Sequence, residues 1–460
     1  MCSIALWYTK QSKMELSPEQ MQALETFKNK RNLFLTGPGG TGKTALIRQM
    51  VDHCKKDGRQ VQVCALTGCA AVLLNCQAKT VHSWAGIGLA NGYADMIIKR
   101  VATNKYKAAQ WKKNDVLIID EVSMMSQKIF EILDGIGRQV RKETAHLPFG
   151  GLQVVFSGDF YQLPPVTREE DAQEDPTASA FCFESPKWSA TFAETIQLKK
   201  IFRQTDQAYT TILNQIRVGK LFKSALETLT PHIGKPLPVD FKPTILLPRR
   251  KDVETINAVE FAKLVGEEKI YKLGAAEAVI PAGAAAAAAR AALSQEQREI
   301  EYNFLVNNIM ADKEIILKKG TQVMCIANID MESPEPIVNG SQGIVIDFVG
   351  NLPLVKFNNG VRRTVGYHTW HSEHIPTIGV KQLPLIYAWA ITIHKAQGVS
   401  LDMAQIDAGS NIFECGQTYV ALSRIKSLEG LYLTAFSPQK IKVNKKVQEF
   451  YATLGNSSGS

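Results

Sequence analysis

The sequence predicts an α/β protein with two parallel-sheet lobes and a small all-β domain inserted in the second lobe. The chain has 460 residues, which is too long for one ordinary hydrophobic core. Short apolar runs alternate with helical patterns in two separate blocks, as in parallel sheets covered by helices. A β-rich stretch with two Asn-Gly pairs interrupts the second block and indicates hairpins.

The first block contains four short runs that are apolar at consecutive positions. Such runs are typical of strands buried on both faces of a parallel sheet. They cover residues 32–36, 61–67, 115–121 and 152–159. Two helical patterns lie between them: one opens at Lys43 and closes with Gly58 as its C-cap, and the other has Ser126 as its N-cap.

The second block is discontinuous. Its segments before the interruption lie at 194–204, 207–219, 243–250 and 251–264, and those after it lie at 383–398, 403–408, 416–425 and 428–436. The β-rich runs between them cover 318–328, 341–350 and 352–370, with Asn-Gly pairs at 339–340 and 359–360. We expect these runs to form hairpins of a small antiparallel barrel.

The expected domain limits follow from these blocks. They are a first lobe at 14–195 with a wedge-like insertion near 85–112, a second lobe at 196–317 and 377–455, a β-barrel insertion at 318–376 and a flexible tail at 456–460. Residues 275–292 are rich in alanine and suit a linker, a helix or a placeholder segment, so we infer no function from them.

Composition narrows the class of protein. The net charge of +9 favours an acidic partner such as nucleic acid, although many basic proteins are merely soluble. The eight cysteines are scattered without a Cys-x-x-Cys pair, as expected of reduced thiols inside a cell. No signal peptide and no apolar run of membrane-spanning length is evident. We therefore expect a soluble, intracellular chain with no membrane partner.

A glycine-rich loop directly after the first apolar run is the strongest chemical signal. Its Gly-x-x-x-x-Gly-Lys-Thr spacing, between a strand and a helix, is that of a phosphate-binding loop. Backbone N–H groups and the positive helix end can hold phosphates, Lys43 would neutralise the β- and γ-phosphates, and the Thr44 hydroxyl would hold Mg²⁺. The expected nucleotide-binding loop comprises Gly37, Pro38, Gly39, Gly40, Thr41, Gly42, Lys43 and Thr44.

Two adjacent carboxylates end the third apolar run. Asp120 is suited to bind Mg²⁺, usually through water, and Glu121 to orient or deprotonate the attacking water. Adjacent acids at a strand end are often only solvated, but this pair follows four apolar residues downstream of a phosphate loop. Because no guanine-reading Asn-Lys-x-Asp element is apparent, we expect ATP as the nucleotide.

The second block indicates what hydrolysis is used for. Two α/β lobes with a cleft between them can open and close with each cycle, and such a motor needs a positive side chain from the far lobe at the γ-phosphate. Arg203 and Arg424 are the candidates, each at the edge of an expected element. Taken alone, either arginine is more typical of a surface ion pair.

Seven segments together carry a resemblance to a known family. They are "GPGGTGKT", "ALTGCAAVLLNCQAKTVHSWAGIG", "IIDEVSMM", "PFGGLQVVFSGDFYQLPPV", "FRQTDQAYTTILNQIRVG", "AWAITIHKAQGVSLD" and "GQTYVALSRIKSLEGL". In content and order they resemble the motifs of the Pif-one (petite integration frequency) family, in the RecD-like branch of superfamily-one helicases. The similarity runs from about Leu16 to Pro438, apart from the alanine-rich region. Residues 126–153 also resemble the signature helix of that family.

The resemblance implies roles for further residues. Gln20 resembles the adenine-reading glutamine, Gln162 would sense the γ-phosphate, and Gly398 would lie at the nucleotide edge of the cleft. Arg203 and Arg424 would complete the site from the second lobe. For the DNA track, the resemblance points to hydroxyl and imidazole side chains that hold phosphates and sugars without reading sequence. These are Thr67, His82, Thr392 and His394.

Two insertions are interpreted with the same family in view. The all-β insertion is similar to the Src-homology-three-like barrel that members place inside the second of their two RecA-like lobes, where it closes over single-stranded DNA. The basic segment at 97–113 contains Tyr106 and Trp111. It suits a strand-separating or DNA-contacting insertion and a solvated basic face equally well.

The resemblance implies an ATP- and Mg²⁺-dependent helicase that moves 5′-to-3′ on single-stranded DNA and unwinds forked or tailed duplexes, as a monomer or as a dimer formed on DNA. Such a protein would act in the nucleus or mitochondrion of a eukaryote, or in the cytoplasm of a bacterial or virus-infected cell. Two alternatives stay open: a translocase that strips proteins from DNA without efficient unwinding, and a non-catalytic single-strand-binding scaffold.

Overall fold

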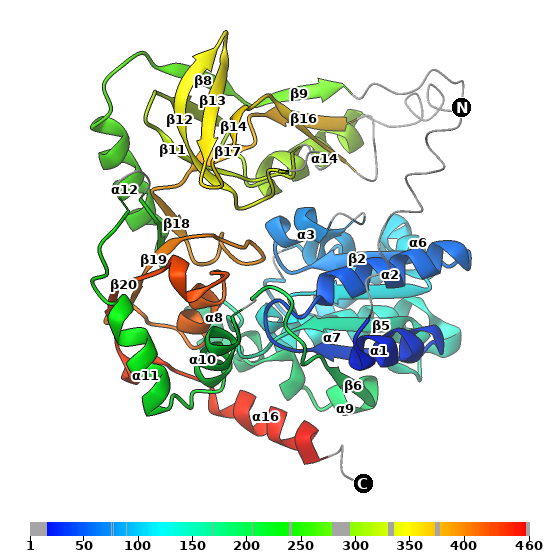
Figure 1. The fold of residues 1–460 in the computed structure, drawn as a ribbon. Coiled ribbons are helices and arrows are strands. Elements are labelled where there is room, and N and C mark those ends of the chain that lie inside the picture. Colours follow the sequence, from blue (N-terminus) through cyan, green and yellow to red (C-terminus); the bar gives the residue numbers. More distant parts are fainter. Residues whose placement is uncertain are drawn as a thin grey trace, which may run out of the picture.

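The computed structural model describes residues 16–74, 76, 78–88, 90–167, 169–204, 206–238, 242–277, 295–329, 335–372 and 378–456. In Figure 1 the first α/β lobe lies at the lower right, the second at the left, and a layer of antiparallel strands covers the top. This arrangement confirms the predicted fold class of two parallel-sheet lobes with an all-β part. None of the helices in the described ranges is long and apolar enough to cross a membrane.

The first lobe is built on a parallel sheet with the strand order β3-β2-β4-β5-β1-β6. Its strands are β1 (Leu33–Thr36), β2 (Val61–Ala65), β3 (Lys79–Thr80), β4 (Val116–Asp120), β5 (Gln153–Gly158) and β6 (Glu194–Gln197). The central strands β1, β4 and β5 are buried at every position, as their uniformly apolar sequences predict. Hydrophobic clusters cover both faces of the sheet.

The helices of the first lobe include the two that the sequence patterns predict. They are α1 (Pro18–Lys28), α2 (Lys43–Lys56), α3 (Gly68–Leu74), α4 (Val81–Ala85), α5 (Ala94–Thr103), α6 (Lys105–Lys113), α7 (Gln127–Val140), α8 (Glu169–Glu174) and α9 (Trp188–Thr191). The Ser126 side chain caps α7 by accepting a hydrogen bond from Ile129 N, and Gly58 takes the left-handed conformation after α2. The predicted Ser126 cap is confirmed, whereas the C-cap residue of α2 is Asp57 and Gly58 follows it directly.

The second lobe has a smaller parallel sheet with the order β18-β7-β19-β20. Its strands are β7 (Thr244–Leu247), β18 (Ala390–Thr392), β19 (Ala404–Ala408) and β20 (Leu431–Phe436). The helices are α10 (Gln207–Arg217), α11 (Lys223–Leu229), α12 (Arg250–Ala262) and α15 (Gln417–Leu422). Most buried residues of this lobe belong to one hydrophobic cluster.

The antiparallel part is larger than the predicted insertion at 318–376. Its strands are β8 (Lys269–Lys272), β9 (Gly274–Glu277), β10 (Glu314–Leu317), β11 (Gln322–Cys325), β12 (Gln342–Val349), β13 (Leu352–Phe357), β14 (Arg362–Thr364), β15 (His368–His371), β16 (Ile378–Gln382) and β17 (Leu385–Tyr387), together with helix α14 (Gln295–Asn308). They form the sheets β14-β13-β12-β11-β17, β15-β16-β9 and β10-β8. Strands on both sides of the expected limits therefore belong to it, because antiparallel pairing joins segments distant in sequence.

Two further limits need correction. The predicted start of the second lobe at residue 196 falls inside β6, which pairs with β1 and so belongs to the first sheet. Helix α16 (Lys445–Asn456) was assigned to the second lobe, but its Val447 and Phe450 pack into the core of the first. The predicted tail at 456–460 and the alanine-rich segment at 275–292 lie mostly outside the described residues.

The basic insertion in the first lobe consists of α5 and α6. Trp111 is fully buried against Trp84, with ring centroids 4.6 Å apart, and its indole N–H donates to Ala85 O at 3.4 Å. Tyr106, in contrast, is 87% exposed. Trp111 therefore stabilises the insertion, and only Tyr106 of the two aromatic residues faces solvent.

Candidate nucleotide site

The glycine-rich loop joins β1 to α2 through a backbone that favours glycine at several points, of which Gly40 and Gly42 lie next to the expected phosphates. Gly40 has φ +84° and a Cβ there would lie 2.6 Å from the Arg203 Cβ. Gly42, at φ +82°, precedes α2, and its Cβ would lie 2.8 Å from Gln20 Nε2. A larger residue at either position would be strained, so glycine lets the loop backbone approach an anion closely.

The Lys43 side chain lies along this loop. Its Nζ donates to Gly37 O at 2.7 Å and to Pro38 O at 3.0 Å. Burial lowers the pKa of Lys43, and the nearby carboxylates of Asp159 and Glu121 act in the opposite direction. The two acceptors of this ammonium group are neutral carbonyls. A charged phosphate would be a stronger acceptor, so Lys43 is well placed to bind one instead.

Two carboxylates stand at the end of β4. Asp120 is buried, and burial raises its pKa. Glu121 has a left-handed backbone, with φ 57° and ψ 39°, which is rare for a residue with a side chain and typical of functional sites. Burial, and then the neighbouring Asp120 carboxylate, raise the pKa of Glu121 to about 7. Together the two acids form the negative side of the site.

A cavity of about 490 Å³ connects the loop with the second lobe. From the first lobe it is lined by residues 39–45, Asp120, Glu121 and Gln162. From the second lobe it is lined by Arg203, Gln397, Gly398 and Arg424. The structure thus brings all five predicted catalytic residues and most of the predicted nucleotide-binding residues to one cavity.

Two guanidinium groups of the second lobe face the loop. A Cβ at Gly39 would lie 3.5 Å from Arg424 Nη2 and 3.6 Å from Arg203 Nη1. Burial lowers the pKa of Arg203, while burial and then the neighbouring Arg203 lower the pKa of Arg424 to about 9. Two buried cations side by side repel each other, so an anion between them and the loop would stabilise both.

Two contacts across the cavity come from residues that sequence reasoning missed. Gln397 Nε2 donates to Glu121 Oε2 at 2.9 Å and lies 3.4 Å from Gln162 Oε1. Gly39 N donates to the Tyr419 hydroxyl at 2.9 Å. Gln397 lies in the segment "HKAQG" and Tyr419 in the segment "GQTYVALSR". Both segments contain predicted site residues, but the sequence alone predicts no role for these two.

Gln20 does not line the cavity. Its Oε1 accepts from Ser17 N at 3.0 Å and its Nε2 donates to Thr41 O at 3.1 Å, so its amide ties α1 to the phosphate loop. These bonds leave the predicted adenine-reading role untested.

The four predicted DNA-contacting residues divide into two pairs. Thr67 and His394 line the cavity. Thr392 is buried at the end of β18, where its Oγ1 accepts from Lys395 N at 3.0 Å, and His82 lies on α4. Burial lowers the pKa of both His82 and His394, which favours neutral imidazoles near pH 7. The DNA track itself stays a prediction.

Comparison with known proteins agrees with this geometry. The family model described as "PIF1-like helicase" matches residues 15–226, and the model described as "DNA helicase Pif1, 2B domain" matches residues 302–348. The ATP-dependent DNA helicase Pif1 of Bdellovibrio bacteriovorus is 34% identical over 95% of this chain and 92% of its own length. The chain belongs to the Pif1 family. The resemblance drawn from the motifs is therefore confirmed.

Solved structures of Pif1 proteins share this fold. The Candida albicans protein has a TM-score of 0.70 and 34% identity, over 96% of this chain and 100% of that one. The Bacteroides protein in complex with ADP-AlF4 has a TM-score of 0.77 and 28% identity, over 97% and 98% of the two chains. Eukaryotic relatives are longer: the chain spans 61% of the Emericella nidulans Pif1 and 64% of the Xenopus laevis Pif1.

Proposed function

We propose that this Pif1-family chain is an ATP-hydrolysing DNA helicase that moves 5′-to-3′ along single-stranded DNA and unwinds duplexes. The observation that carries the proposal is the cavity whose walls come from two lobes. One wall has a phosphate loop and two carboxylates, and the other has the buried Arg424 and the partly buried Arg203. A site completed only when both lobes meet can convert the loss of a phosphate into relative motion of the lobes.

The residues of the first wall suit the hydrolysis step. Lys43 would exchange its two loop carbonyls for the β- and γ-phosphates, and Glu121 would orient the attacking water. Thr44 and Asp120, which both line the cavity, would hold Mg²⁺. When bound, that ion would neutralise charge on the phosphate oxygens. Gln162, at the same wall, would contact the γ-phosphate.

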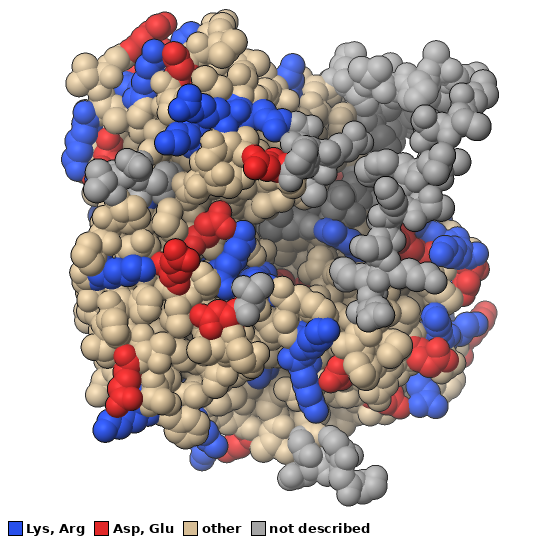
Figure 2. All heavy atoms as spheres, in the orientation of Figure 1, with Lys and Arg blue, Asp and Glu red and all other residues tan. Residues whose placement is uncertain are grey.

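Single-stranded DNA is the proposed partner. Related structures support it: Bacteroides Pif1 has been solved bound to ssDNA, and two coordinating Pif1 helicases have been solved at forked dsDNA. Figure 2 shows a group of Lys and Arg side chains over the antiparallel strands at the top of the molecule. Strands β13, β14 and β16 carry the exposed Lys356, Arg362 and Lys381. Such side chains attract phosphates without reading sequence.

The decisive experiment compares unwinding of duplexes with a 5′ or a 3′ single-stranded tail. We expect ATP-dependent unwinding from the 5′ tail only, and ATP hydrolysis stimulated by single-stranded DNA. Unwinding from only the 3′ tail would overturn the direction. DNA-stimulated hydrolysis that displaces a bound protein but separates no strands would favour the translocase, and DNA binding without hydrolysis would favour the scaffold.

A further inference from the structure

A second junction between the lobes lies outside the nucleotide cavity. Asp159 follows β5, and Arg217 is the last residue of α10 in the second lobe. Arg217 Nε donates to Asp159 Oδ2 at 2.9 Å, and Nη2 donates to Oδ1 at 2.8 Å. Asp159 is fully buried and Arg217 is 5% exposed. The two lobes are therefore joined by a buried ion pair with two hydrogen bonds.

Aromatic rings enclose this ion pair. The rings of Tyr161 and Tyr451 stack with centroids 4.7 Å apart and an interplanar angle of 15°. The Arg217 guanidinium lies 4.5 Å from the Tyr161 centroid and 5.3 Å from the Tyr451 centroid. Burial alone would lower the pKa of Arg217, but the Asp159 carboxylate raises it above its usual value. The pair is charged and complete, so separating it would leave a buried charge alone.

Tyr451 connects the pair to the phosphate loop. Its hydroxyl lies 2.6 Å from Thr36 Oγ1, and Thr36 directly precedes the loop. The same hydroxyl accepts a hydrogen bond from Phe160 N at 3.2 Å. Because Tyr451 belongs to α16, the last helix described, this contact also holds the end of the chain against the first lobe.

The backbone of Tyr161 and Gln162 is fixed from the second lobe as well. Gly416, which precedes α15 with φ +74°, lies so close that a Cβ would be 2.4 Å from Tyr161 O and 2.6 Å from Gln162 O. Gln162 comes three residues after Asp159 and lines the nucleotide cavity. The position of its side chain thus depends on the junction formed by Asp159, Arg217 and Tyr451.

The two sets of contacts between the lobes differ in strength. Across the cavity, Gln397 reaches Glu121 and Tyr419 reaches Gly39 through single neutral donors or acceptors. At the junction, two charge-assisted bonds are enclosed by aromatic rings. Charge-assisted pairs of this kind are about twice as strong as neutral hydrogen bonds. The Gln397 bond to a charged Glu121 is also charge-assisted but single, so when the lobes move we expect the cavity contacts to break before the enclosed two-bond junction does.

We propose that Arg217 is a positioning residue: it anchors the pivot about which the lobes turn and holds Gln162 in place for the γ-phosphate. The inference rests on the proposed ATP hydrolysis and adds a residue that does not itself line the cavity. Because the pivot lies close to the expected γ-phosphate position, the cavity can open by rotation of the lobes. Gln162 then keeps its position on the first lobe.

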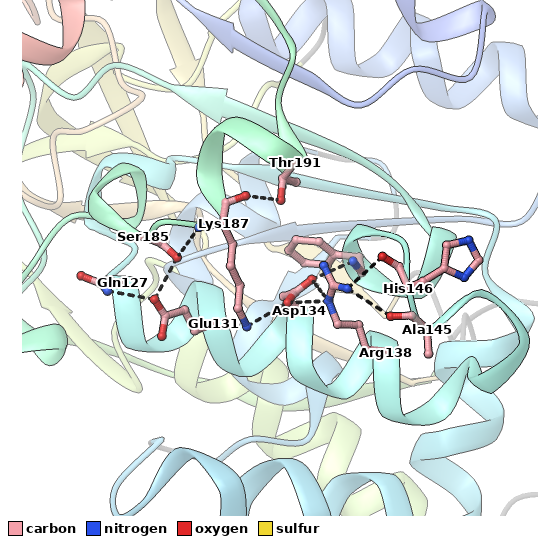
Figure 3. A network of polar contacts seen from close by, with 10 residues as sticks. Gln127, Glu131, Asp134, Arg138, Ala145, His146, Ser185, Lys187 and Thr191 are labelled. Atoms are coloured by element: carbon pink, nitrogen blue, oxygen red, sulfur yellow. Dashed lines mark hydrogen bonds and ion pairs between the residues drawn. The ribbon is translucent and has the colours of Figure 1, made fainter.

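A second buried carboxylate, paired with two partly exposed cations, supplies a control. Asp134 on α7 is fully buried and accepts from Arg138 Nε at 2.9 Å, from Lys187 Nζ at 3.0 Å and from Phe149 N at 2.8 Å. Figure 3 shows this network, in which Arg138 also donates to the carbonyls of Ala145 and His146. All of its members belong to the first lobe. Arg138→Lys therefore perturbs a buried carboxylate without touching the junction between the lobes.

The test measures affinity for ADP and for ADP-AlF4, a mimic of the transferring phosphate, in the full chain. We expect Arg217→Lys to bind ADP within about twofold of the original protein, but to lose about tenfold or more of the extra affinity that AlF4 confers, with a matching fall in kcat. Arg138→Lys should lower the melting temperature by about as much as Arg217→Lys does. It should nevertheless keep the extra affinity that AlF4 confers. Tyr451→Phe removes one hydroxyl. It should keep its affinity for ADP and lose about threefold of the extra affinity that AlF4 confers.

The outcomes separate this inference from the function on which it rests. If Arg217→Lys and Tyr451→Phe lose no more AlF4-dependent affinity than Arg138→Lys, Arg217 is only structural and the inference fails. If Arg217→Lys does not fold, the Tyr451→Phe comparison decides. If the original protein hydrolyses no ATP, the proposed function fails, and the positioning role fails with it.

Discussion

The two walls of the nucleotide cavity are built differently. The first-lobe wall includes residues 39–45 of the loop and the start of α2, Asp120 and Glu121 at the end of β4, and Gln162 shortly after β5, and the strands that carry them are buried. The second-lobe wall includes the side chains of Arg203, Gln397 and Arg424, which come from separate segments, and Tyr419 of the same lobe contacts the loop at Gly39 without lining the cavity. From this difference we propose that the first wall holds the reacting groups, whereas the second senses whether the lobes have closed.

The largest effect is expected on the first wall. Lys43→Ala removes the only ammonium group placed by the loop at the expected phosphates, so ATP hydrolysis should fall more than about 1,000-fold. Single-stranded DNA affinity should stay within a few-fold, since the expected DNA contacts lie elsewhere. Steady-state hydrolysis and fluorescence anisotropy measure the two quantities. Lys56→Ala, on the exposed side of the same helix, is the control; hydrolysis that survives Lys43→Ala would contradict the role of the first wall.

A smaller but still large effect is expected on the second wall. Arg424→Lys keeps the positive charge but loses the planar fork, so kcat should fall about 100-fold while the KM for ATP changes little. The split between kcat and KM is the readout, because a group that acts only when the lobes close stabilises the transition state alone. Arg250→Lys, at an exposed ion pair, serves as the control. If the KM for ATP rose by a factor similar to the fall in kcat, Arg424 would instead contribute to ground-state binding of ATP.

Most of the fold could be predicted from local pattern. The buried strands β1, β2, β4 and β5 were predicted because uniformly apolar runs need two covered faces, and the Asn-Gly pairs predicted antiparallel hairpins. The errors concern the sheet or core against which an element packs. The strand β6 and the helix α16 have ordinary local patterns, and nothing in such a pattern says which of two cores will bury it.

The same division holds at the site. Lys43, Thr44, Asp120 and Glu121 could be predicted because the chemistry is compressed into contiguous motifs. The bonds of Gln397 and Tyr419 could not, since each depends on the distance between two lobes, which no single segment encodes.

Gln397→Ala tests the bond between the walls at Glu121. The hydrogen bond from Gln397 favours the charged form of Glu121, which burial and Asp120 disfavour. Its removal should lower kcat about fivefold to tenfold, the effect of one such bond. The control is Gln382→Ala, a buried glutamine that donates to Tyr271 O and Asp312 O in the antiparallel part. Equal losses for both variants would show that stability, and not the bond to Glu121, limits the rate.

The smallest effect, and one of opposite sign, is expected at Tyr419. Its hydroxyl accepts from Gly39 N, a donor that the loop needs for phosphate, so nucleotide binding must break this bond. Tyr419→Phe removes the competition and should tighten ADP binding about twofold to fivefold, measured by calorimetric titration. Tyr209→Phe loses a similar buried bond, to Leu422 O inside the second lobe, and should leave ADP affinity unchanged. Weaker ADP binding by Tyr419→Phe would mean that the second wall shapes the loop for phosphate instead of competing with it, and the two walls would then share the task of binding.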